Sequence, residues 1–248
     1  MDITWSFQHT ACRIYEIFHY IDACIITSAM KQLQNVTETV LEALNTGNWA
    51  TYGGKIILAT PSGARPHWMA DKYAEVLRVN PNHQRAHFGG RHNHCFTSPV
   101  YRRKVHEMDT RLAQRYGNHP AGIAWHISNE FGGECRCPLC QEAFRDFLRE
   151  KFGGDISKLN RAYWTTFWSH TYDSFEQIDP PGPMTETGVH GLNLDWHRFV
   201  THQTMDFIQN EVDPIRTHSP ALPVTINMMY EFYDLDYHKV SQIIDFAS

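Results

Sequence analysis

The 248-residue sequence lacks the features of membrane, secreted and nucleic-acid-binding proteins. It has no run of about 18 apolar residues, so we expect no membrane span. No basic stretch followed by an apolar core opens it, so we predict no secretory signal and expect a cytoplasmic location. The net charge is −5 and Lys and Arg form no cluster, which argues against nucleic acid as a partner. The 42% apolar and 20% charged residues are typical of a soluble globular protein.

Cysteine is scarce, and half of it is gathered in one short stretch. Six cysteines occur in the chain, and Cys135, Cys137 and Cys140 lie close together. Without a secretory signal, thiols or metal ligands are favoured over disulfide bonds. A turn can gather such thiols around a tetrahedral ion, for which zinc is the default. The alternative interpretation is a redox-active or unmetallated thiol cluster.

A tetrahedral site needs a fourth ligand from elsewhere in the chain. We select Cys95, because its loop and the loop after residue 130 are expected at the same end of the sheet; His92 and His94 are the alternatives. A site with four protein ligands is closed, so the metal would hold two loops together and take no part in the chemistry.

Apolar strands and amphipathic helices alternate along most of the chain. Residues 55–60 are predicted to form a buried strand, followed by Pro61-Ser62-Gly63 without an acid. Ser98 is predicted to cap a helix that ends at Gly117, before the strand 122–127. This strand–helix–strand rhythm predicts a parallel α/β fold. We predict further helices over 138–152, 157–163, 194–212 and 236–244, and strands over 223–228 and from 245.

The strand 122–127 ends in Asn129 and Glu130, and two glycines follow. Its apolar, β-favouring residues are typical of a strand buried on both faces. In a parallel α/β barrel the carboxyl ends of the strands carry the active site. Glu130 is therefore a candidate catalytic carboxyl on a rigid element, and Asn129 can hydrogen-bond a substrate hydroxyl. The alternative is a solvated strand-end glutamate.

Large aromatic rings alternate with polar residues between positions 163 and 172. Indole faces suit the weakly apolar C–H faces of sugar rings, although tryptophan is also ordinary core material. Trp168 is the candidate wall of a sugar site.

Several motifs together resemble glycoside hydrolase family 42, whose members are mostly bacterial β-galactosidases. They are FGGRHNHC at 88–95, WHISNE at 125–130, the cysteines at 135, 137 and 140, and FWSHTY at 167–172, in the family's order. The resemblance runs from about residue 55 to residue 248. It implies a (β/α)8 TIM barrel, incomplete here, with roughly strands 3 to 6 recognisable. Residues 51–248 would then be a partial catalytic domain, and residues 1–50 a poorly assignable N-terminal segment.

The resemblance also implies a function: hydrolysis of terminal β-D-galactosides with retention of configuration. Glu130 matches the family's general acid/base, and Asn129 the neighbour that binds the sugar's 2-hydroxyl. Arg91 matches a sugar-binding arginine, and Trp168 a tryptophan of the substrate site. The full-length form is expected to be a homotrimer. The structural zinc ligands of many members match Cys95, Cys135, Cys137 and Cys140.

A retaining mechanism needs a second carboxyl, the nucleophile, about 5 Å from the acid/base. The family's nucleophile lies on the seventh strand, which is expected beyond the C-terminus of this chain. Glu231 follows the fifth-strand region and does not match it. We therefore predict that the chain alone is inactive or nearly so.

Three other functions fit parts of the pattern. The chain could be a zinc-stabilised carbohydrate-binding fragment without catalysis, or a barrel glycosidase for another sugar, such as an α-L-arabinoside. A zinc-dependent hydrolase is the third, and the closed set of four ligands argues against it.

Overall fold

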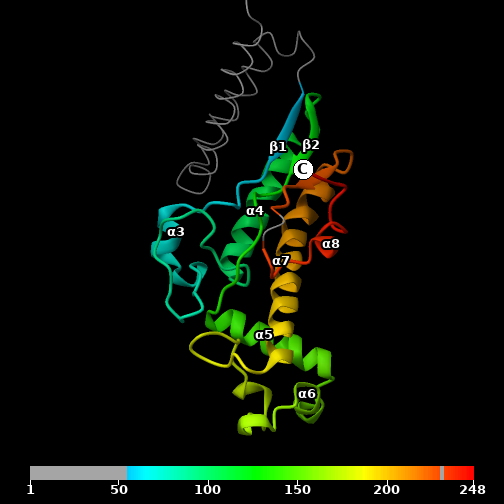
Figure 1. The fold of residues 1–248 in the computed structure, drawn as a ribbon. Helices are drawn as coiled ribbons and strands as arrows, with labels where there is room; N and C mark the ends of the chain where they lie inside the picture. The colour runs from blue at the N-terminus through cyan, green and yellow to red at the C-terminus, as the bar shows by residue number, and fades with distance from the viewer. Residues whose placement is uncertain (1–54, 230–231) are drawn as a thin grey trace, which may run out of the picture.

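Helices and strands alternate along the computed structural model, which describes residues 55–229 and 232–248 (Figure 1). The predicted N-terminal segment 1–50 and Glu231 lie outside the described residues. No helix in the described part of the chain is long and apolar enough to span a membrane. The elements are β1 (Ile56–Ala59), α3 (His67–Lys72), η1 (Ala74–Val76), α4 (Pro99–Tyr116), β2 (Gly122–His126), α5 (Pro138–Phe152), α6 (Ile156–Tyr163), η2 (Phe167–Ser169), η3 (Phe175–Gln177), α7 (His190–His218), β3 (Val224–Ile226), α8 (Tyr237–Val240) and β4 (Phe246–Ala247).

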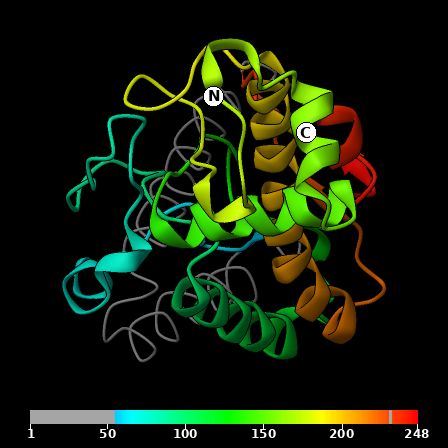
Figure 2. The ribbon, with the colours of Figure 1, turned by 90° about the horizontal axis from the view of Figure 1, so that it is seen from below.

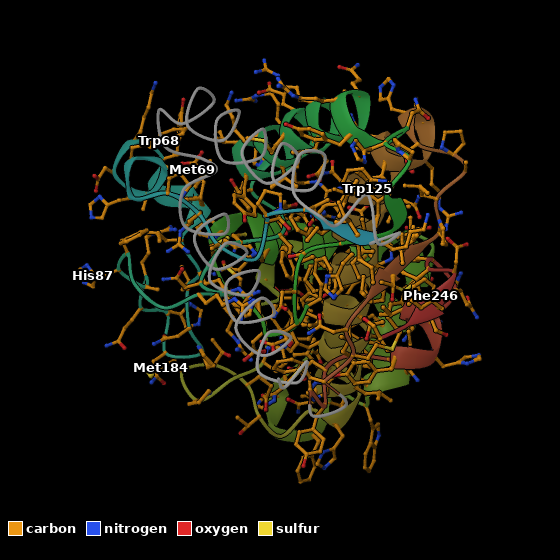
Figure 3. The ribbon with its side chains drawn as sticks, turned by 90° about the horizontal axis from the view of Figure 1, so that it is seen from above. Trp68, Met69, His87, Trp125, Met184 and Phe246 are labelled. Carbon is orange, nitrogen blue, oxygen red and sulfur yellow. The ribbon has the colours of Figure 1, made fainter. Side chains whose placement is uncertain are left out.

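The four strands form one parallel sheet in the order β1-β2-β3-β4, which is also their order in the sequence. Leu58 lies opposite Trp125, and Thr225 lies opposite Phe246. Figure 3 shows Trp125 of β2 and Phe246 of β4 on one side of the molecule and Trp68 of α3 on the other. Sequential parallel strands joined through helices are a section of a (β/α)8 barrel, which confirms the predicted fold class.

The strands are less buried than the sequence predicts. Ile57 on β1 and Ile123 on β2 are 42% and 44% exposed, although β1 was expected to be a buried strand and β2 to be buried on both faces. Trp125, by contrast, is fully buried in the main hydrophobic cluster. In a closed barrel, one face of each strand points to the interior and is covered by the other strands. A section of four strands does not close the sheet, so part of that face stays accessible.

Helix α4 begins where the sequence predicts it. The Ser98 side chain accepts a hydrogen bond from the Tyr101 backbone N–H, and Pro99 occupies the first turn. The helix ends at Gly117 as predicted, but the φ of this glycine is −61°, which is right-handed and not the left-handed conformation usual for a glycine after a helix. Close packing explains the glycine, because a Cβ at this position would lie 2.6 Å from Cβ of Ser219.

Helix α7 is longer than the predicted 194–212, and it contains Pro214. A proline inside a helix leaves the carbonyl four residues earlier without its usual amide donor. Here that carbonyl belongs to Asn210, and the ring of His106 on α4 hydrogen-bonds it at 3.1 Å between Nδ1 and the oxygen. The neighbouring helix thus replaces the lost hydrogen bond, and α7 continues.

The long helix α7 packs against α4 at one end and α5 at the other (Figures 1 and 2). The first cluster contains Trp125 and Phe207 under the sheet. The second, around Phe144 and Trp196, joins α5 and α6 to the start of α7. Helix α8 is one turn long, shorter than the predicted 236–244, whereas α5 has the predicted bounds. The loops that follow β1 and β2 pack into the first cluster, through Leu77, Phe96 and Phe131.

Candidate active site and metal centre

The turn after β2 brings Glu130 to the carboxyl end of the sheet. The Ile127 N–H donates to the Thr225 carbonyl oxygen at 2.8 Å, so pairing with the next strand continues past β2. Ser128 and Glu130 then have φ angles of 51° and 49°, in the left-handed region that non-glycine residues rarely adopt. The Glu130 side chain is 33% exposed. The turn therefore presents a carboxyl at the strand end that remains accessible to a ligand.

Asn227, at the end of β3, holds this turn. The Glu130 backbone N–H donates to Oδ1 of Asn227 at 2.8 Å. Nδ2 of Asn227 lies 3.5 Å from Oδ1 of Asn129, which orients the Asn129 amide. Nδ2 of Asn129 is buried and has no hydrogen-bond partner in the described part of the chain, so this donor can serve a ligand hydroxyl. The sequence prediction missed Asn227, although an asparagine directly after an apolar strand was an available signal.

Arg91 and His92 reach the same carboxyl from the loop before α4. Nη1 of Arg91 lies 3.7 Å from Oε2 of Glu130, and both side chains are about one third exposed. Burial lowers the pKa of His92, and the positive charges of Arg91 and Arg78 lower it further. His92 is therefore neutral near pH 7, and it also hydrogen-bonds the Asn129 backbone. The predicted pair Arg91 and Glu130 is thus brought together, with a neutral imidazole beside it.

Arg78 connects the two loops that form the site. Its Nε donates to the His94 carbonyl at 2.7 Å and its Nη2 to the Gly132 carbonyl at 2.8 Å. Its guanidinium also lies over the Phe96 ring, 4.9 Å from the centroid. Gly133 has a φ of 76°, and a Cβ there would collide with Nη1 of Arg78. Gly133 therefore allows both the reversal of the backbone after Glu130 and the close approach of Arg78.

Four buried cysteines meet beside these loops. The Sγ atoms of Cys95, Cys135, Cys137 and Cys140 all lie within 4.8 Å of one another, and none is in a disulfide. Cys95 lies 3.6 Å from Cys137 and 3.4 Å from Cys140, and Cys137 lies 3.7 Å from Cys140. With metal–sulfur bonds of about 2.3 Å, the sulfurs of a tetrahedral site are roughly 3.8 Å apart. The cluster therefore fits a four-coordinate metal ion.

Cys95, the predicted fourth ligand, is the fourth cysteine of this group. His92 and His94, the alternatives, are not in this group, which is the only such group found in residues 55–229 and 232–248. Neighbouring sulfurs and burial raise the pKa of the Cys95 thiol.

Two hydrogen-bond donors and a cation lie next to the sulfurs of the cluster. The Val79 N–H donates to Sγ of Cys135 at 3.4 Å, and Nε2 of Gln203 donates to Sγ of Cys140 at 3.3 Å. The charge of Arg78 also acts on Cys135. Donors and a nearby cation offset the charge of metal-bound thiolates.

A buried carboxyl lies beneath the turn, on the helix side of the sheet. Oε2 of Glu211 accepts from the Thr60 hydroxyl at 2.9 Å, and Oε1 accepts from the Ser62 hydroxyl at 2.6 Å. Burial raises the pKa of Glu211 to about 7, although the two hydroxyl donors act in the opposite direction. The sequence prediction noted no acid after the first strand. The acid comes instead from α7, and nothing in the spacing of the sequence indicates that Glu211 meets Thr60 and Ser62.

The predicted site residues therefore fall into three sets, of which the four cysteines of the sulfur cluster are one. Glu130, Asn129 and Arg91 lie together at the end of β2, with Asn227 added by the structure. Trp168 belongs to η2, and the placement of its side chain lies outside what the structure describes.

Comparison with known proteins identifies the class of protein to which this chain belongs. Solved structures that resemble this chain are glycoside hydrolases with a TIM-barrel domain. They include Gan42B, a GH42 β-galactosidase, with a TM-score of 0.78 and 53% identity over 80% of this chain and 30% of that one. The cold-adapted β-galactosidase of Rahnella sp. R3 has a TM-score of 0.76 and 53% identity over 78% of this chain and 28% of that one.

The family model described as "Beta-galactosidase", that of glycoside hydrolase family 42, matches residues 40–248. The chain is 55% identical over 196 residues to β-galactosidase BglY of Alicyclobacillus acidocaldarius, covering 79% of this chain and 28% of that protein. It is 56% identical over 199 residues to β-galactosidase Pbg of Clostridium perfringens, covering 79% and 29%. The chain belongs to glycoside hydrolase family 42. It spans less than a third of the length of these relatives.

Proposed function

We propose that this chain supplies the acid/base half of the active site of a retaining β-galactosidase. The observation that supports this most directly is the Glu130 carboxyl at the carboxyl end of β2, partly exposed and 3.7 Å from the Arg91 guanidinium. Names of the relatives, all β-galactosidases, support the substrate class. Residues 51–248 are then part of the catalytic barrel.

Glu130 acts twice in this mechanism. In its protonated form it gives a proton to the glycosidic oxygen while the nucleophile attacks the anomeric carbon of galactose, so the leaving group departs as a neutral alcohol. As a carboxylate it then takes a proton from the water that attacks the same carbon and releases galactose. The hydrogen bond from its backbone N–H to Asn227 keeps the carboxyl at one place through both steps.

Asn129, Arg91 and Trp168 bind the sugar. The Nδ2 donor of Asn129, oriented by Asn227, serves the 2-hydroxyl of galactose. Hydrogen bonds to this hydroxyl strengthen in the transition state of glycoside hydrolysis. Arg91 binds a further sugar oxygen and keeps the Glu130 carboxyl in place, and Trp168 forms an apolar wall for the sugar ring.

The nucleophile is expected outside these 248 residues, so the chain by itself is inactive or nearly so. A single carboxyl can donate a proton, but it cannot also form the glycosyl–enzyme intermediate of a retaining enzyme.

Zinc is the metal we assign to Cys95, Cys135, Cys137 and Cys140. The four buried sulfurs and their spacing support it. When bound, zinc supplies a cross-link between the loop at 95 and the loop that follows Glu130, and it takes no part in catalysis. We further propose that the complete protein is a homotrimer in the cytoplasm.

A chimera tests the function. The region of β-galactosidase GanA of Bacillus subtilis, 52% identical over 202 residues, that matches this chain is replaced by residues 55–248. We expect the chimera to hydrolyse aryl β-galactosides, and the 248-residue chain alone to give no turnover above the blank. In Glu130→Gln, hydrolysis of lactose should fall by about 10²- to 10⁴-fold, the usual contribution of a general acid. The kcat/KM for 2,4-dinitrophenyl galactoside, which reports only the glycosylation step, should fall much less, because its leaving group needs no proton.

Azide supplies a second readout, because it replaces the water that needs a base and should yield β-galactosyl azide in Glu130→Gln. The matched control is Glu134→Gln, four residues along the same loop, whose carboxylate contacts Arg136 and Trp196. It should show no dependence on the leaving group. Equal losses on both substrates in Glu130→Gln would contradict the acid/base assignment. Galactose binding without hydrolysis would indicate a carbohydrate-binding fragment, and a preference for aryl arabinosides another glycosidase.

A further inference from the structure

A chain of hydrogen bonds runs from the interior of α7 to the turn that carries Glu130. The Glu211 carboxyl accepts from the Thr60 hydroxyl at 2.9 Å, and the oxygen of that hydroxyl accepts from the Ser128 backbone N–H at 2.7 Å. Glu211 is 0% exposed, Thr60 1% and Ser128 6%, so water does not compete for these groups. The chain links three elements, since Thr60 directly follows β1 and Ser128 follows β2.

The directions of these bonds depend on one another. The Thr60 hydroxyl has a single hydrogen, and donation to Oε2 of Glu211 directs the oxygen's lone pairs toward the Ser128 amide. Ser62 holds the other carboxyl oxygen at 2.6 Å, so the Glu211 side chain cannot turn without breaking a second bond. Tyr101 of α4 donates in turn to the Ser62 backbone carbonyl. The acceptor for the Ser128 amide is therefore fixed by contacts on α4 and α7.

The turn itself requires such an anchor. Ser128 and Glu130 both have left-handed φ angles, a conformation that persists in non-glycine residues only where the surroundings enforce it. Two of the side-chain bonds that hold it, one on each flank, are those from the Ser128 N–H to Thr60 and from the Glu130 N–H to Asn227, and the His126 ring also bonds the Ser128 carbonyl. Loss of the first would leave a buried amide without an acceptor, and the turn would rearrange.

We propose that Thr60 and Glu211 are positioning residues for the Glu130 carboxyl, acting through the Ser128 amide. This inference rests on the proposed function, because it concerns the orientation of the carboxyl that acts as acid/base. Glu211 aligns the Thr60 hydroxyl, the hydroxyl fixes Ser128, and the fixed turn points Glu130 at the glycosidic oxygen. Neither side chain contacts the sugar.

The kinetic test uses the GanA chimera and two galactosides. Thr60→Val keeps the shape of the side chain and removes the hydroxyl, and Thr60→Ser keeps the hydroxyl. In Thr60→Val, kcat/KM for lactose, which reports the glycosylation step, should fall by at least about tenfold, the effect of a buried amide left unsatisfied. The kcat/KM for 2,4-dinitrophenyl galactoside, whose glycosylation step needs no proton from Glu130, should change by no more than about threefold, and so should kcat/KM for either substrate in Thr60→Ser. Glu211→Gln, with one acceptor oxygen for two hydroxyls, should resemble Thr60→Val.

A matched control separates positioning from general destabilisation. Thr204 on α7 is also fully buried, and its hydroxyl donates to the Val200 carbonyl of its own helix at 2.8 Å. Thr204→Val makes the same chemical change and should affect both substrates alike. Equal losses on the two galactosides in Thr60→Val, or no loss on lactose, would overturn the proposal.

Hydrogen exchange supplies a readout that does not need activity. In the purified 248-residue chain, Thr60→Val should speed amide exchange in the peptide containing residues 128–130 by about tenfold or more. The rate of amide exchange in the peptide containing α5 should not change. If the parent chimera is inactive, the proposed function fails, and exchange alone decides this inference: an unchanged rate at 128–130 overturns it.

Discussion

Removal of zinc from the four-cysteine cluster should destabilise the chain by an amount that its geometry predicts. A metal bound there would join Cys95 to the turn at Cys135, and so would close a loop of about 40 residues in the chain-entropy treatment of cross-links. Opening a loop of that length costs about 4 kcal/mol. For a domain of this size, 1 kcal/mol shifts Tm by roughly 2–4 °C, so we expect a fall of roughly 8–16 °C.

The assay is thermal unfolding with and without a strong chelator, with the metal content measured in parallel. We expect one zinc per chain before chelation, and recovery of Tm when zinc is added back. Cys135→Ser and Cys95→Ser should unfold near the chelated wild-type temperature and should not respond to the chelator. The matched control is His92→Gln, because His92 lies outside the sulfur cluster, and this variant should keep its zinc.

Two results would refute this reasoning. One is complete loss of zinc with no change in Tm, which would mean that the cross-link contributes nothing to stability. The other is loss of zinc binding in His92→Gln but not in Cys95→Ser, which would mean that the fourth ligand is not the one that the structure brings to the cluster.

Two further predictions concern the loop after Glu130 and the carboxyl beneath it. Gly133→Ala should lower Tm and chimera activity together, because residue 133 has a left-handed φ of 76° and the added Cβ would displace Arg78. The control is Gly154→Ala, at a position that is also left-handed but has nothing within 4 Å of the added Cβ. Equal effects of the two substitutions would contradict the role of Arg78. Glu211 has a folded-state pKa of about 7, above the usual 4.5, so its contribution to stability is present at low pH and is lost as pH rises from 4.5 to 7. We expect a loss of about 3 kcal/mol over this range. Urea unfolding should show a flatter pH profile in Glu211→Gln; an unchanged profile would assign the dependence to Asp109, the buried carboxyl of α4 that faces Glu211 and whose pKa burial also raises.

Much of the site could be predicted from local patterns. The apolar strand that ends in Asn129 and Glu130, and the cysteines at 135, 137 and 140, are features of adjacent residues. Their structural meaning follows from strand periodicity and from ligand spacing, which need no knowledge of distant segments. The choice of Cys95 needed one further step, that loops at the same end of a parallel sheet meet, and the structure places its sulfur within 4.8 Å of the other three.

Other features could not be predicted because they depend on distant residues. Asn227 lies 97 positions from Glu130, and Glu211 lies 151 from Thr60. Whether such side chains meet is decided by strand register and by the rotation of a helix about its axis. The exposed Ile57 and the right-handed Gly117 are differences of the same kind, since both depend on what packs against them.

The sequence by itself therefore determined which chemical groups this protein has at the end of β2 and in the sulfur cluster, because short segments of chain carry their own conformational preferences. Only the tertiary structure decided how those groups are held. The hydrogen bonds from Glu211 through Thr60 to Ser128, and from Glu130 to Asn227, join three strand ends and one helix. Hydrogen bonds are short and directional, so their partners are defined only after the sheet and its covering helices have packed.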